Sequence, residues 1–134
     1  MDRCNLVLGI RPEIPSARVT QNMSEGEQFQ NGTLRPIIKF QNPLFVVMFR
    51  NYIVKYKNAF HQLPTQKRFE YIENAVQKDM KFRNSLKGTV IGQFTLEEYE
   101  TYIKNSSALN KRMMNMVVER LKDQIQLFEE VSLV

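Results

Sequence analysis

Few residues of this chain have side chains that act as nucleophiles or as soft metal ligands. His61 is the only histidine and Cys4 is the only cysteine. A Cys–His catalytic pair would require the N-terminal segment to fold onto His61, and a metal site of several His and Cys ligands is excluded by their number. A single cysteine has no disulfide partner within the chain, which is typical of proteins in a reducing compartment.

Carboxylates and glycines offer no recognisable catalytic or phosphate-binding motif. The acidic groups Glu97, Glu98 and Glu100 lie close together, but their spacing is that of neither a metalloprotease helix nor a calcium-binding loop. The five glycines are scattered and form neither a Walker loop nor a dinucleotide-binding turn. We therefore expect no catalytic activity, no cofactor and no bound metal.

Basic residues are concentrated in the middle of the chain. Eleven Lys and Arg residues fall between Arg35 and Lys87, against three acidic residues, in a chain of net charge +5. Cations that converge on one face can bind the phosphates of a nucleic acid. The candidates for such a site are Arg50, Lys55, Lys57, Lys67, Arg68, Lys78, Lys81 and Arg83. No known nucleic-acid-binding signature accompanies them, so they could equally form the solvated faces of two helices.

Two neighbouring segments would have to position this basic block. Apolar residues at intervals of three and four predict a helix over 43–63, with Asn42 as its cap and Pro43 at its first position. Pro64 should end it, and a second helix is predicted over 66–84. The short link between the two predicts an αα-hairpin.

The C-terminal part of the chain carries two further helix signals. Thr95 and Glu98 have the spacing of a capping box, and the short helix that follows should turn Leu96, Tyr99 and Ile103 inward. A last helix is predicted from about Ser106 to about 130. Its apolar stripe is the candidate protein interface, unless it is fully buried: Met114, Val117, Leu121, Ile125 and Phe128.

Residues 1–34 are predicted to form an irregular arm, and residues 35–134 a single helical domain. Short strands are considered over 5–10, 34–40 and 89–94. No apolar run approaches the length of about 18 residues that spans a membrane. The N-terminal segment lacks the features of a secretory signal, so an intracellular location, in the cytoplasm or nucleus, is expected.

The sequence thus predicts a mainly α fold of about four helices, in which the αα-hairpin packs against a long C-terminal helix. Its function is predicted to be protein–protein interaction or oligomerisation without catalysis, with another protein or a second copy of the chain as partner. The alternative is a DNA-binding protein that uses the basic central helices.

Overall fold

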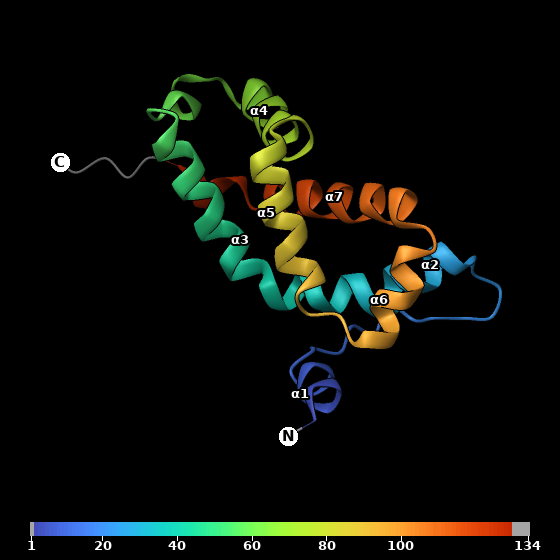
Figure 1. The fold of residues 1–134 in the computed structure, drawn as a ribbon. Helices are drawn as coiled ribbons and strands as arrows, with labels where there is room; N and C mark the ends of the chain where they lie inside the picture. Colours follow the sequence, from blue (N-terminus) through green and yellow to red (C-terminus); the bar gives the residue numbers. More distant parts are fainter. Residues whose placement is uncertain (1, 130–134) are drawn as a thin grey trace.

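The computed structural model describes residues 2–129, which fold into helices joined by loops, including a long one over residues 10–24 (Figure 1). Those residues contain no β-strand, so the mainly α fold is confirmed and the short strands are not formed. The α-helices are α1 (Arg3–Gly9), α2 (Glu25–Phe29), α3 (Arg35–Lys55), α4 (Thr65–Lys78), α5 (Met80–Ile91), α6 (Leu96–Ile103) and α7 (Ser106–Asp123). A π-helical segment, η1 (Gln30–Leu34), joins α2 to α3, and η2 (Ala59–Gln62) and η3 (Ile125–Phe128) are 3-10 turns.

Helix α3 begins well before the predicted start and runs through Pro43. Proline has no N–H to donate to the carbonyl four residues earlier, and such positions bend helices; Figure 1 shows α3 bent between its first and second halves. Helical structure also extends back to Glu25, because Ser24 caps α2 and accepts a hydrogen bond from the Glu27 N–H. Residues 25–34 therefore belong to the folded domain and not to an irregular arm.

The helix predicted over 66–84 is two helices that meet at Asp79. Asp79 has extended backbone angles, φ −81° and ψ 99°, and its side chain accepts a hydrogen bond from the Phe82 N–H. An aspartate that caps the next helix in this way competes with continuation of the previous one. Helix α5 then continues to Ile91, beyond the predicted end near Asn84.

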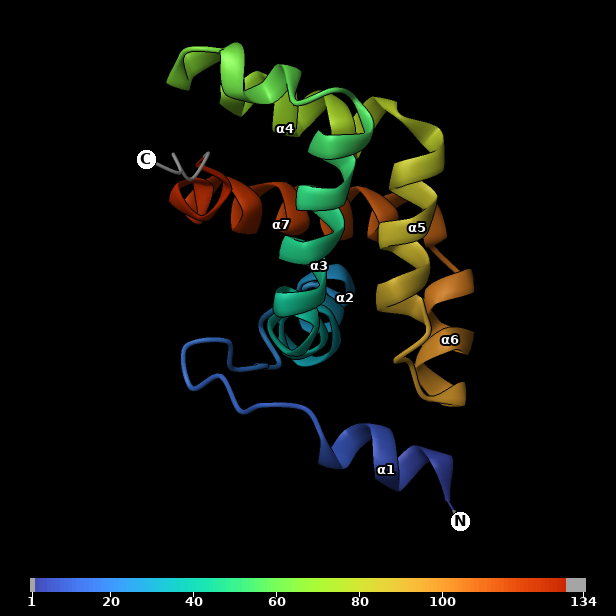
Figure 2. The ribbon, with the colours of Figure 1, turned by 90° about the vertical axis from the view of Figure 1, so that its left-hand side faces the viewer.

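Helix α7 lies at the centre of the domain and packs against α3, α4 and α5, as expected for the C-terminal helix. It ends at Asp123, and η3 follows it. Position 130, where the sequence predicted the end of this helix, lies outside the described residues. The two helices of the predicted αα-hairpin, α3 and α4, cross at a steep angle (Figure 2), and α4 packs mainly against α5 and α7. The Tyr71 ring of α4 lies 6.2 Å from that of Phe49 in α3 and 5.3 Å from that of Phe60 in η2, measured between centroids.

The capping box at the start of α6 is confirmed, since the Thr95 hydroxyl accepts from the Glu98 N–H and the Glu98 carboxylate accepts from the Thr95 N–H. The inward face of α6 differs from the prediction. Tyr102 is the residue that α6 buries, whereas Leu96 and Ile103 are exposed. A helix of only eight residues turns one side to the core. In α6 this is the side that carries Tyr102.

Candidate protein-binding surfaces

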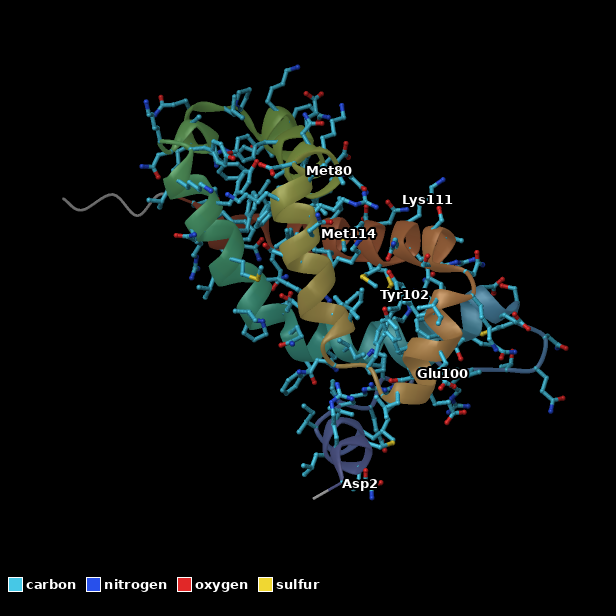
Figure 3. The ribbon with its side chains drawn as sticks, in the orientation of Figure 1. Asp2, Met80, Glu100, Tyr102, Lys111 and Met114 are labelled. Carbon is cyan, nitrogen blue, oxygen red and sulfur yellow. The ribbon has the colours of Figure 1, made fainter. Side chains whose placement is uncertain are left out.

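The stripe of α7 that the sequence marked as a protein interface lies in the core. Met114, Val117 and Leu121 have no exposed surface, and Figure 3 shows Met114 where α5 crosses α7. Ile125 is partly buried against the same cluster. Phe128 is turned back by η3, and its ring centroid lies 4.8 Å from that of Phe49. Four of these five residues are buried and Ile125 is partly buried, so the condition on which the interface prediction depended, that the stripe is not fully buried, is not met in the folded chain.

Four of the eight basic candidates donate hydrogen bonds within the chain. Arg68 donates to the backbone carbonyls of His61 and Leu63 and lies over the Phe60 ring. The other three contacts join Arg50 to the Leu127 carbonyl, Arg83 to the Gln77 side chain and Lys67 to Glu70. The guanidinium groups of Arg68 and Arg83 thus serve local structure.

The remaining basic candidates are exposed, and two of them share a hollow. Lys55 on α3 and Lys81 on α5 line a depression of about 240 Å³ beside Tyr52, Tyr56 and Phe82. Lys57 and Lys78 are exposed but do not line it. The structure therefore brings Lys55 and Lys81 together, and does not gather the whole basic block into one groove.

Asp79 fixes the wall of this hollow. One of its carboxylate oxygens accepts hydrogen bonds from the hydroxyl groups of Tyr52, at 2.9 Å, and Tyr56, at 3.1 Å. The N–H of Phe82 and these hydroxyl groups hold the pKa of Asp79 below its usual value. Burial and the neighbouring carboxylate raise the pKa of Tyr52 well above 10. The tyrosines accordingly stay protonated and hold α3 against the start of α5.

Helix α3 has a second apolar side, which faces away from the core and which the sequence analysis did not detect. We call this side the outer stripe; its members are Leu44, Val47, Asn51 and Val54, separated by three, four and three residues. Leu44 is 45% exposed, Val47 58% and Val54 63%. That spacing places them on one side of a helix. Figure 1 shows α3 at the edge of the molecule, with α5 and α7 on one side of it only.

The outer stripe is flanked by positive charge. Arg50 and Lys55 lie beside it, and the whole of α3 contains four basic residues and neither Asp nor Glu. An apolar stripe with charged borders is the pattern by which one helix recognises another. The border charges determine which partner is accepted, because like charges at such positions repel.

A second outward apolar stripe lies on α6. Leu96 is 77% exposed, Ile103 55% and Tyr99 47%, and they are spaced by three and four residues. We call these three residues the α6 stripe. Glu97 and Glu100 are exposed beside it, and α6 contains no Lys or Arg. The two exposed stripes therefore have borders of opposite charge.

A larger cavity, of about 940 Å³, separates residues 14–17 from α7. Its charged lining residues are of both signs: Arg35, Arg112, Arg120, Glu119 and Asp123. Among residues 2–129, no group of three or more His, Cys, Asp and Glu side chains could hold a metal ion. None of the helices in the described part of the chain is long and apolar enough to cross a bilayer.

Comparison of the chain with protein-family models, with curated proteins and with solved structures finds no match.

Proposed function

We propose that this protein is a non-catalytic protein-interaction module and that the outer stripe of α3 is its contact surface. The observation that carries the proposal is the exposure of Leu44, Val47 and Val54 at helical spacing on a helix whose opposite side is core. Single exposed apolar residues are ordinary on protein surfaces, whereas a contiguous apolar patch with a polar border is typical of a binding site.

The arrangement of the core supports this choice of surface. Phe45, Phe49 and Ile53 on the inner side of α3 are almost completely buried and hold the helix in place. The outer stripe is therefore presented on a rigid element, and binding does not require the helix to leave the domain. The contact surface proposed from α7 in the sequence is replaced by this one.

The alternative, DNA binding, has less support. Among the basic candidates, Arg50, Arg68 and Arg83 direct their guanidinium groups to acceptors within the chain. Lys55 and Lys81 do lie together, but the hollow that they line also contains the Asp79 carboxylate, which repels phosphate. Salt-sensitive binding of a generic duplex that is lost when both lysines are changed to Glu would favour DNA binding over our proposal.

Site-specific photo-crosslinking tests the proposal. A photoreactive phenylalanine analogue is placed at Val47, and at Lys111 on α7 in the control protein, since Lys111 is exposed well away from α3 (Figure 3). We expect protein adducts from position 47 and not from position 111, in cells that express the chain. The adducts from position 47 should disappear when Leu44→Asp is added, because a charge in the stripe makes burial costly.

Equal adduct yields from positions 47 and 111 would contradict the proposal. So would adducts from position 47 that Leu44→Asp leaves unchanged, provided that the variant unfolds at the same urea concentration as the parent protein. Leu44 is nearly half exposed, so the stability of the monomer should change by less than about 0.5 kcal/mol.

A further inference from the structure

We infer that the partner of the outer stripe is a second copy of this chain, which contributes its α6 stripe. The inference rests on the proposed function and names the partner. Each molecule would then use α3 to bind α6 of the next molecule, head to tail. The evidence lies in the spacing, the opposite charges and the separate positions of the two stripes.

The α6 stripe is shorter than the outer stripe and can lie along part of it. The outer stripe spans about 15 Å from Leu44 to Val54 and the α6 stripe about 10 Å from Leu96 to Ile103, at a rise of about 1.5 Å per residue. The α6 stripe has apolar side chains at intervals of three and four residues. The outer stripe has them at Leu44, Val47 and Val54, with the polar Asn51 between the last two, so both lie along one side of a helix and can pack as neighbouring helices do. Tyr99 also brings a hydroxyl group that can hydrogen-bond with the amide of Asn51.

Charge selects this pairing over a symmetric one. Two outer stripes face to face would bring Arg50 and Lys55 against the same cations of the other copy, because α3 has no acidic residue. Two α6 stripes would likewise bring Glu97 and Glu100 together. Opposite charges meet along the length of both stripes when α3 of one copy faces α6 of the other, and like charges in close contact across an interface weaken it.

A molecule cannot satisfy this contact by itself. Helix α5 lies between the second half of α3, which carries the outer stripe, and α6 in Figure 1, and the residues of both stripes are exposed. A contact between two different surfaces is heterologous, so it continues from molecule to molecule unless a ring closes. Each contact involves only two or three helical turns and is small, so we expect association at protein concentrations of about 100 μM and above.

Complementation between two variants provides the decisive test. Val47→Asp disables the outer stripe and leaves α6 intact, and Ile103→Asp disables the α6 stripe and leaves α3 intact. The two positions have nearly equal exposure, 58% and 55%, so each variant controls for the other. Sedimentation velocity should show association of the parent chain beyond a dimer and each variant alone as a monomer.

An equimolar mixture of the two variants should form a one-to-one dimer, because one intact outer stripe and one intact α6 stripe remain. The double variant Val47→Asp/Ile103→Asp should stay monomeric, alone and in a mixture with either single variant, because it has neither stripe intact. Charge reversal gives an independent form of the same test: Lys55→Glu and Glu100→Lys should each weaken association by about tenfold, and their mixture should restore it.

Several outcomes would overturn the inference. The parent chain could stay monomeric at about 1 mM, or the mixture of the two variants could stay monomeric while the parent chain associates. Binding of the parent chain to phosphatidylserine-containing vesicles, lost in Val47→Asp without any self-association, would assign the outer stripe to a membrane surface instead.

The photo-crosslinking experiment separates failure of this inference from failure of the proposed function. Adducts from position 47 that contain a different protein, together with a monomeric parent chain, would leave the proposed function intact and refute the second copy as partner. Absence of any adduct above the level at position 111 would refute both.

Discussion

Arg11 and Glu98 form a two-point ion pair across 87 positions of the sequence, with N–O distances of 2.6 and 2.7 Å. The same carboxylate accepts from the Thr95 N–H at the start of α6 and from the Thr33 hydroxyl in η1. Glu98 thus joins the N-terminal segment, the entry to α3 and the cap of α6. Arg11 adds a hydrogen bond to the Gln93 carbonyl.

Replacement of Arg11 by Ala should lower the free energy of unfolding by about 1–3 kcal/mol, because hydrogen bonds to a charged, mostly buried partner are lost. Urea unfolding followed by circular dichroism measures the change. Arg18 is exposed in the same segment, so Arg18→Ala should change stability by less than about 0.5 kcal/mol. Equal effects of the two substitutions would show that the ion pair contributes little.

The charge of Glu98 predicts how stability depends on pH. Burial alone would raise the pKa of Glu98, but hydrogen bonds from Arg11 and the Thr95 N–H outweigh it and hold that pKa below its usual value of 4.5. The folded state therefore favours the ionised form more than the unfolded state does. Its contribution is fully present above pH 4.5 and is lost as the pH falls from there through the lower, folded-state pKa.

Glu98→Gln should accordingly be less stable than the parent chain at neutral pH and should lose less stability on acidification. Urea unfolding at a series of pH values between about 6 and 3 gives both quantities. Because other carboxylates titrate equally in the two proteins, the difference between their curves isolates Glu98. Parallel curves would contradict the pKa shift.

Local signals in the sequence predicted those elements that depend on local chemistry. Thr95 and Glu98 form the predicted capping box because both groups belong to one helical turn. Phe45, Phe49 and Ile53, three of the apolar residues whose spacing predicted the helix over 43–63, occupy the core. The spacing of the α7 stripe was also read correctly, yet its role was not, because periodicity alone does not say whether a stripe meets its own domain or a partner.

The outer stripe was missed for a related reason. The run from Leu44 to Val47 is apolar at every position, so the pattern does not reveal which side of α3 faces the core. That choice depends on where α5 and α7 pack, which is a tertiary property. Pro43 was predicted to start a helix, but it lies inside α3. Apolar periodicity predicted one helix through Asp79, but Asp79 caps α5 and so separates α4 from α5.

Asp79→Asn should separate the helix-capping role of Asp79 from its effect on the two tyrosines. Asparagine caps nearly as well as aspartate, so α5 should persist and stability should fall by no more than about 1 kcal/mol. The pKa of Tyr56 should drop towards 10, since the hydrogen bond to Asp79 is the main cause of its rise. The pKa of Tyr52 should drop only in part, because burial contributes most to its shift.

Alkaline titration followed by the NMR signals of the individual tyrosine rings measures both shifts, and Asp123→Asn on the exposed end of α7 serves as the control. An unchanged titration in Asp79→Asn would refute the assignment of Asp79 as the common acceptor. Because the pKa values of both tyrosines are raised in the folded state, their protonated forms stabilise the fold fully below pH 10. This contribution to the free energy of unfolding is lost as the pH rises through the folded-state pKa values.

The neighbouring residues Leu127 and Phe128 in η3, just after α7, differ in burial. Substitution of each one tests whether Phe128 belongs to the core or to an interface. Phe128 is buried against Phe49, whereas the side chain of Leu127 is exposed. Phe128→Ala should lower the free energy of unfolding by about 3–5 kcal/mol, because it removes a ring from the centre of the aromatic cluster. Leu127→Ala should cost less than about 1 kcal/mol, since it keeps the backbone carbonyl that accepts from Arg50. If Phe128 were instead exposed at an interface, its replacement would weaken association and leave the unfolding of the monomer unchanged. Urea unfolding of a dilute, monomeric sample of Phe128→Ala therefore tests whether the ring is part of the core.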